Sequence, residues 1–153
     1  MREILFRGKC KDTGEWRKGF YINLHKTTYC FKEDYEANKD NDVHQIVFEE
    51  MTDWGLPNQY FRVDVIPETI GQYTGLIDKN GTKIFEGDIV KIGGDNLPYW
   101  MEVGKFKPVE YINDGFCPFT EYDNDCGTWL MAKDCEVIGN IHDNPELVKE
   151  REG

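Results

Sequence analysis

Short apolar runs separated by turn-forming residues fill most of the chain, and this pattern limits the fold more than any other feature. Residues 73–77 and 83–85 are strand-like runs that flank the segment 78–82, which contains the dipeptide Asn80-Gly81. An Asn-Gly pair adopts positive φ at low energetic cost and favours a two-stranded hairpin. We therefore expect Gly81 at the tip of a tight hairpin. Ile84 and Phe85 point to opposite faces, so we expect one to be buried more deeply than the other.

The same pattern continues on both sides of this hairpin. Residues 15–22 alternate in polarity as in a half-buried strand, with Trp16, Lys18, Phe20 and Ile22 on one side. Lys18 and Tyr21 are the exceptions to this apolar–polar alternation. Further strands are expected at residues 3–7, 61–65, 89–92, 99–106, 109–112, 116–122, 128–132 and 136–138. The sequence therefore predicts a mainly β fold of short antiparallel strands joined by Gly-rich turns.

Two segments depart from the strand pattern. Residues 32–42 are polar and mostly acidic, which suits a mobile loop or a short exposed helical turn. Near the end of the chain, Asn144 can cap a helix with Pro145 as its first residue. We expect this short C-terminal helix at residues 145–150.

Length and composition favour one compact domain at residues 1–153. The chain has 153 residues, of which 39% are hydrophobic and 14% aromatic, too many for an intrinsically disordered chain. No run approaches the ~18 apolar residues of a membrane-spanning helix. The charged first residues lack the apolar core of a secretion signal, and an odd number of cysteines, 5, favours reduced thiols. We expect a cytoplasmic protein with no membrane contact.

The charge balance bears on the partners. Lys and Arg number 18 and Asp and Glu 29, which gives a formal net charge of −11. Such a charge repels phosphate backbones and anionic lipids, and therefore disfavours nucleic acid as a ligand. Two interpretations stay open: the charge serves solubility, or it forms an acidic surface that meets a basic protein or imitates DNA.

Metal and cofactor motifs do not emerge. Cys117, Cys126 and Cys135 are evenly spaced, but structural zinc sites bring ligands in pairs two to four residues apart. The run that ends at Gly81 resembles part of a calcium loop, yet Leu76 and Gly87 occupy two of its ligand positions. We therefore predict no metal and no cofactor.

Catalytic patterns are equally absent. The chain has no phosphate-binding loop, dinucleotide fingerprint or nucleophile elbow. His25, His44 and His142 are isolated in sequence, and a Cys–His nucleophile pair assembled in space remains open. Chance carboxylate pairs are certain among 29 acidic residues, so their number carries no information. No catalytic, cofactor-binding or metal-binding residue is assigned.

The second half of the chain is rich in aromatic residues. Aromatic side chains on a small barrel can stack nucleic-acid bases, but such sites lie in basic grooves and this half holds few cations. Packing in the core is the favoured interpretation. The residues concerned are Tyr99, Trp100, Phe116, Phe119, Tyr122 and Trp129.

Three stretches together resemble the YopX family of phage and prophage proteins. They are RGK at residues 7–9 with GEWRKGFYI at 14–22, PETIGQYTGLIDKNGTKIFEGDIV at 67–90, and VIGNIHDNPEL at 137–147. The resemblance spans nearly the whole chain. The segments around residues 24–60 and 93–130 carry no family motif, and we interpret them as variable insertions and loops.

The resemblance implies a fold and a biological setting. The fold is expected to be an SH3-like barrel or roll of short antiparallel strands, with extra β insertions and a short C-terminal helix. The family occurs in phages and prophages, largely of Gram-positive bacteria. The expected setting is therefore the cytoplasm of the host bacterium. The family implies no established activity and no catalytic residue. In this interpretation the motif residues are structural, with Ile84, Ile89 and Val90 in the core.

Three hypotheses for function remain. The first is a non-enzymatic binding or assembly module that meets a host or phage protein, by analogy with other SH3-like barrels. The second is an acidic mimic of DNA that inhibits a host nucleic-acid-binding protein. The third is an enzyme with an unrecognised carboxylate and histidine site. Exposed strand edges also favour a homo-oligomer, because a second copy commonly covers such edges.

Overall fold

The computed structural model describes residues 1–93, 103–112, 114–119, 122–123 and 128–149. The chain divides into two compact units. The N-terminal unit comprises Ile4–Ile70, and the C-terminal unit comprises Gly71–Gly153 together with Met1–Glu3.

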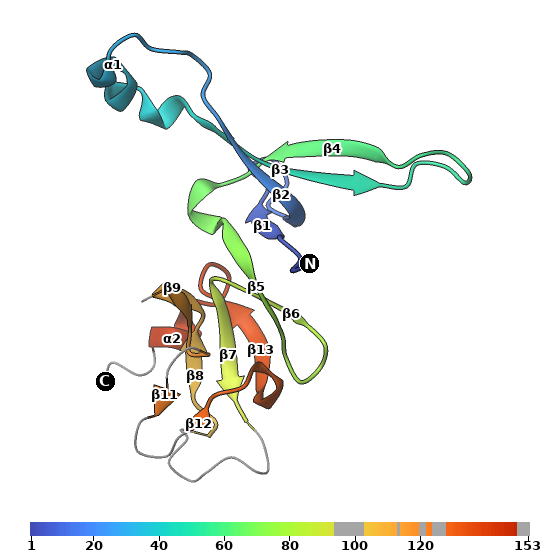
Figure 1. Ribbon diagram of the computed structural model, residues 1–153, viewed down its shortest axis with the longest axis vertical. Coiled ribbons are helices and arrows are strands. Elements are labelled where there is room, and N and C mark those ends of the chain that lie inside the picture. The colour runs from blue at the N-terminus through green and yellow to red at the C-terminus, as the bar shows by residue number, and fades with distance from the viewer. Residues whose placement is uncertain (94–102, 113, 120–121, 124–127, 150–153) are drawn as a thin grey trace. The chain divides into compact units, whose positions relative to one another are not determined.

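An antiparallel sheet forms the N-terminal unit, with its strands in the order β4-β3-β2-β1 (Figure 1). In the turn between β1 and β2, the Gly14 N–H donates to the Cys10 carbonyl at 2.9 Å. Strands β2 and β3 pair from Phe20 opposite Val47 to Leu24 opposite Val43. The strands are β1 (Phe6–Lys9), β2 (Trp16–Leu24), β3 (Val43–Glu50) and β4 (Gln59–Asp64).

Two short helical segments lie between β2 and β3, and a third follows β4. They are the helix α1 (Lys32–Ala37) and the 3-10 turns η1 (Lys39–Asn41) and η2 (Pro67–Thr69). The polar segment at residues 32–42 therefore forms an exposed helical turn, which was one of the two expectations for it.

The inner face of this sheet is the core of the N-terminal unit. Ile46 of β3 and Val65 are fully buried there. Gly19 of β2 lies on the same face, where a Cβ atom would meet the carbonyl oxygen of Val47 and the side chain of Ile46. A larger residue at position 19 would therefore push β2 away from β3.

Small antiparallel sheets form the C-terminal unit. They are β13-β7-β8, β9-β10, β11-β12, and the hairpin of β5 and β6 (Figure 1). The strands and helical segments are β5 (Gly71–Ile77), β6 (Lys83–Phe85), β7 (Asp88–Ile92), β8 (Phe106–Pro108), β9 (Glu110–Ile112), β10 (Gly115–Cys117), β11 (Tyr122–Asp123), β12 (Thr128–Trp129), η3 (Ala132–Asp134), β13 (Cys135–Asn140) and α2 (Glu146–Lys149).

A hydrophobic cluster holds this unit together. It confirms the core positions expected for Ile84 and Val90, and Ile89 is buried as well. Phe116 and Phe119 also lie in the core, as expected for these aromatic residues. Tyr99 and Trp100 lie outside the described residues. The cluster comprises Ile84, Val90, Ile92, Val109, Phe116, Phe119, Leu130, Ala132 and Cys135.

The predicted hairpin is present. Gly81 has φ +83 at its tip, and Ile77 lies opposite Lys83. The expected difference between Ile84 and Phe85 was wrong, because both are buried, with exposures of 0% and 1%. Ile84 joins the hydrophobic cluster, whereas the Phe85 ring packs at 5.5 Å from the Tyr73 ring. Both faces of β6 are therefore covered.

The mainly β fold and the short C-terminal helix are confirmed. Helix α2 follows a turn in which the Asn140 N–H donates to Asn144 Oδ1 at 3.4 Å. Glu150, the expected last helical residue, lies outside the described residues, as do parts of the strands expected at 99–106 and 116–122. The SH3-like barrel and the single domain at residues 1–153 stay predictions. Among the described residues, no helix has both the length and the apolar content needed to cross a bilayer.

Candidate interaction surface

The outer face of the N-terminal sheet gathers apolar side chains from three strands. Residues directly opposite each other in an antiparallel pair lie on the same face, and side chains along one strand alternate between faces. Phe20 lies opposite Val47, and Val47 lies opposite Arg62. We call this surface the apolar sheet face. It comprises Phe20, Ile22, Leu24, Val43, Val47 and Tyr60.

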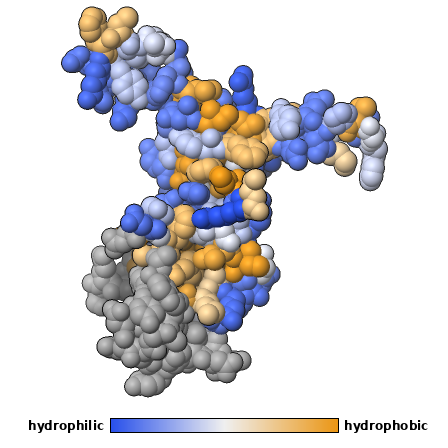
Figure 2. Space-filling view, in the orientation of Figure 1, coloured by the Kyte–Doolittle hydropathy of each residue, from blue (hydrophilic) through white to orange (hydrophobic). Residues whose placement is uncertain are grey.

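This face is open to solvent. Phe20 is 62% exposed, Leu24 45% and Ile22 36%, although each belongs to a regular strand. Figure 2 shows hydrophobic side chains gathered over the sheet of β2, β3 and β4. Single exposed apolar residues are common on protein surfaces, but a contiguous group on one sheet face is typical of a binding surface.

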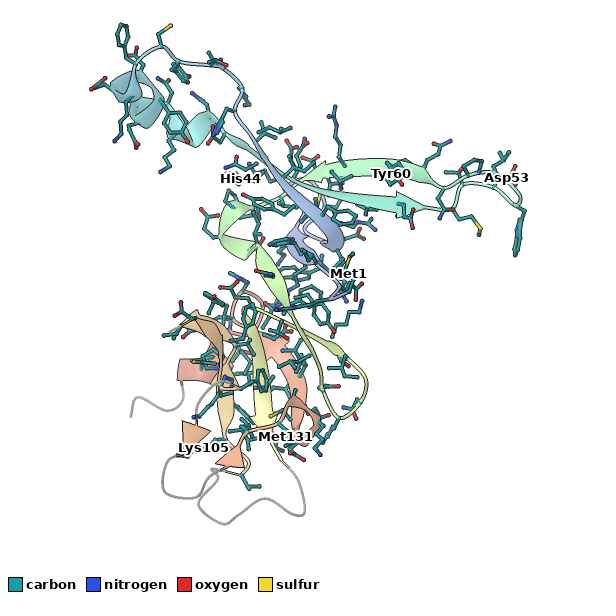
Figure 3. All side chains as sticks on the ribbon, in the orientation of Figure 1. Met1, His44, Asp53, Tyr60, Lys105 and Met131 are labelled. Carbon is teal, nitrogen blue, oxygen red and sulfur yellow. The ribbon has the colours of Figure 1, made fainter. Side chains whose placement is uncertain are left out.

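The connection between β3 and β4 adds a second apolar element. Figure 3 places Asp53 at the tip of this connection, and the Trp54 N–H donates to Asp53 Oδ1 at 2.7 Å. Trp54 is 87% exposed, and Met51 and Leu56 are exposed as well. We call these three residues the hairpin tip.

Charged residues of both signs lie on the face that carries the apolar sheet face. Lys18 and Arg62 are cationic, whereas Glu49 and Asp64 are anionic. The Gln45 side-chain amide donates to Asp64 Oδ1 at 2.7 Å across β3 and β4. The surface is therefore apolar at its centre and electrostatically mixed, rather than uniformly acidic.

The sequence pattern located β2 but not its exposed side. The alternation of Trp16, Lys18, Phe20 and Ile22 is present in the strand, yet Phe20 and Ile22 lie on the outer face. Gly19 and Tyr21 lie on the inner face. Lys18 on the apolar side of the pattern was the available signal, because a lysine does not suit a buried strand face.

A hydrogen-bonded Tyr–His pair lies on the inner face. The Tyr21 hydroxyl and His44 Nδ1 are 2.7 Å apart, and the rings stack with centroids at 6.0 Å. Burial, together with the nearby Asp42 carboxylate, raises the pKa of Tyr21. The hydroxyl therefore stays protonated at neutral pH, and which partner donates in this hydrogen bond depends on the tautomer of the imidazole. This contact joins β2 to β3.

A second histidine pairs with a carboxylate. His25 Nδ1 lies 2.7 Å from Asp42 Oδ1, and the His25 ring meets the Tyr35 ring of α1 edge-on at 5.2 Å. These contacts tie the segment that contains α1 to the ends of β2 and β3. His142 belongs to the C-terminal unit, where its backbone N–H donates to Asn140 Oδ1 at 3.0 Å. The structure thus brings His25 and His44 to Asp42 and Tyr21 rather than to a cysteine.

The thiols differ in environment. Burial raises the pKa of Cys135 to about 12, which keeps this thiol protonated. Hydrogen bonds from Thr13 lower the pKa of Cys10. Cys10, Cys30, Cys117 and Cys135 are free thiols, and Cys126 lies outside the described residues. Within the part of the chain that the structure describes, no group of His, Cys, Asp and Glu residues is arranged to hold a metal ion.

Comparison with known proteins shows the family. Residues 5–149 match the family model described as YopX protein. The chain belongs to the YopX family. No curated protein matches it significantly.

A solved structure supports the fold. The crystal structure of protein EF1440 from Enterococcus faecalis is similar to this chain, with a TM-score of 0.51 and 23% sequence identity. The match covers 97% of this chain and 100% of that chain. At this identity the similarity shows a shared fold.

Proposed function

We propose that this phage-type protein is a non-enzymatic assembly module of the bacterial cytoplasm, which binds a host or phage protein through its apolar sheet face. The exposure of Phe20, Ile22 and Leu24 on one regular sheet face is the observation that carries the proposal. Each Å² of apolar surface removed from water contributes about 25 cal/mol. A partner that covers this face therefore gains binding energy without any change in the sheet.

The chemistry of the surface favours an apolar partner over an imitation of DNA. A DNA mimic needs a surface of regularly placed negative charges, whereas Lys18 and Arg62 interrupt the charges of Glu49 and Asp64. The hairpin tip offers Trp54, and tryptophan is one of the residues that most often dominate binding energy at interfaces.

The titratable pairs support a binding module as well. Tyr21 with His44, and His25 with Asp42, each hold strands or a helix of the N-terminal unit together. Their contacts account for these side chains as structural groups.

Capture of partners by immobilised protein tests the proposal. We expect the wild-type chain to retain a protein from a host-cell lysate in about 0.5 M salt, where surface electrostatics are screened. Phe20→Glu introduces a charge at the centre of the apolar sheet face and should reduce the capture roughly tenfold or more.

Ile77→Glu is the matched control, because Ile77 is 52% exposed in β5 of the C-terminal unit. This control should retain the partner. Equal capture by Phe20→Glu and the wild type would contradict the proposal. Capture that disappears in salt would instead favour the acidic mimic. A blank capture with turnover on a substrate panel would favour an enzyme.

A further inference from the structure

Strand β4 is the outer strand of the N-terminal sheet, and its hydrogen-bonding edge is regular. The Val65 N–H donates to the His44 carbonyl at 2.9 Å, so His44 and Val65 form a hydrogen-bonded pair. Such pairs alternate along antiparallel strands, which places the backbone groups of Phe61 and Val63 toward β3. The N–H and C=O groups of Tyr60 and Arg62 consequently point away from β3, toward the open edge.

Along residues 59–63 this edge lacks the usual features that prevent pairing, whereas at its C-terminal end the Asp64 carbonyl already accepts from the Lys11 N–H at 2.9 Å and Cys10 lies opposite Val65. Natural sheets protect exposed edges with proline, lysine, bulges or covering segments. Residues 59–64 contain neither proline nor lysine, and β3 and β4 pair without a register shift from Gln45–Asp64 to Glu50–Gln59. In the described part of the chain, β4 is the last strand of its sheet and Tyr60 is 76% exposed (Figure 3).

We propose that a second copy of this chain binds the open edge of β4 by antiparallel strand pairing, with Phe61 of one copy opposite Phe61 of the other. In this register Tyr60 of each copy lies opposite Arg62 of the other. The backbone groups of Tyr60 and Arg62 point outward. The two Tyr60–Arg62 pairs, one on each side of the two-fold axis, can therefore form hydrogen bonds between the copies.

Side-chain chemistry selects this register. A register centred on Arg62 would place two guanidinium groups directly opposite each other, which is unfavourable. A register centred on Tyr60 would move Arg62 beyond the first residue of the other β4, Gln59. In the Phe61-centred register each Arg62 lies beside an exposed tyrosine ring, a cation–π arrangement. Among the described residues the Arg62 guanidinium has no ion pair, so it is available for this contact.

The pairing would also enlarge the binding surface. Residues opposite each other share a face, so Tyr60 and Arg62 place the apolar sheet faces of both copies on the same side of one continuous sheet. In this respect the pairing deepens the proposed function and rests on it, because one partner protein could then cover the apolar sheet faces of both copies. The net charge of −11 on each chain opposes association, and added salt should therefore strengthen the dimer.

Sedimentation equilibrium of the full chain tests the pairing. We expect a mass twice the 17.9 kDa of one chain, and this mass should fall toward that of one chain on dilution. Arg62→Pro removes an outward N–H from each copy and leaves the inward ladder of Phe61 and Val63 in place. It should give a monomer at concentrations where Arg62→Ala, which keeps the N–H, is still a dimer. A wild-type monomer throughout, a dimeric Arg62→Pro, or a fully monomeric Arg62→Ala would overturn the proposal.

A disulfide trap tests the register and remains informative if Arg62→Pro fails to fold. In a Cys30→Ser, Cys126→Ser background, Phe61→Cys places two thiols in a non-hydrogen-bonded pair, whose Cα atoms lie about 4.5 Å apart. We expect rapid cross-linking under mild oxidation. Tyr60→Cys is the control, because its counterpart in the other copy is displaced along the strand. Absence of cross-linking for Phe61→Cys, or equal cross-linking for both variants, would contradict the register.

The dimer and the proposed function can fail separately. Phe20→Glu should lose the captured protein and keep the mass of a dimer. A monomeric wild type whose capture still depends on Phe20 would overturn only the dimer. A dimeric wild type whose capture is independent of Phe20 would overturn only the proposed function.

Discussion

Asp78 is a buried carboxylate that organises the hairpin between β5 and β6. Its Oδ1 accepts from the N–H groups of Asn80 and Thr82, each at 2.8 Å, and its Oδ2 accepts from the Val137 N–H at 3.0 Å. Burial disfavours the charged form, but these donors outweigh burial and lower the pKa of Asp78. The carboxylate is therefore a structural anchor, and its oxygens are occupied by the backbone.

We predict that Asp78→Asn destabilises the protein by about 1–3 kcal/mol at neutral pH, because the amide nitrogen cannot accept the N–H groups. Because the pKa of Asp78 is lowered in the folded state, its carboxylate stabilises the fold fully above the unfolded pKa of about 3.9. This stabilisation is lost as the pH falls through the folded pKa. The difference between wild type and variant in urea unfolding should therefore shrink at acidic pH. Glu110→Gln, an exposed carboxylate of β9, serves as the control. An unchanged urea midpoint for Asp78→Asn at pH 7 would refute this role.

Gly81 permits the turn at the tip of the same hairpin. Its φ of +83 is costly for a residue with a Cβ atom, although no atom lies within 4 Å of the Cβ position. We predict that Gly81→Val lowers the melting temperature, with a loss of roughly 1 kcal/mol or more. Gly93→Ala is the control, because its backbone is not in the left-handed region and its Cβ would meet nothing closer than 4.0 Å. A thermal scan in which Gly81→Val melts like the wild type would show that this segment serves a partner rather than the fold.

At the level of elements, local chemistry defined some strands well and left others open. The hairpin of β5 and β6 was predictable because Asn80-Gly81 specifies its turn from neighbouring residues alone. The exposed side of β2 was not predictable in this way. It depends on Ile46 and Val65, which lie far from β2 in sequence and take the inner face.

The candidate surface was missed for the same physical reason. An alternating strand has one apolar side in the sequence, and covering that side is the ordinary outcome. In β2 the core instead uses Gly19 and Tyr21, so the apolar side of the pattern became the exposed one. Lys18 in the apolar pattern was a local sign of this arrangement, and the pairing partners of β2 establish it.

We predict opposite responses from the two faces of the N-terminal sheet. Ile46→Ala removes a fully buried side chain and should cost about 2–5 kcal/mol. Phe20→Ala removes an exposed side chain and should change stability by about 0.5 kcal/mol or less. Urea unfolding of both variants measures the difference. Similar losses from both would mean that the outer face is packed in solution.

At the scale of the whole molecule, the two compact units raise the question of cooperativity. A domain of about 60 residues buries only about 60% of its unfolded surface and is marginally stable alone. Consistent with a single domain at residues 1–153, we predict one calorimetric unfolding transition. Ile46→Ala in the N-terminal unit and Asp78→Asn in the C-terminal unit should both lower it as a whole. Two transitions, each lowered by only one of the substitutions, would show two independent domains.

The central claim is that the apolar sheet face binds a protein partner by burial of apolar surface. Titration calorimetry of the captured partner at several temperatures measures this most directly, because burial of apolar surface gives a negative heat-capacity change. We predict a negative heat-capacity change for the wild-type chain, affinity that persists in salt, and loss of binding for Phe20→Glu. A heat-capacity change near zero, with affinity that falls steeply in salt and is unaffected by Phe20→Glu, would contradict the claim.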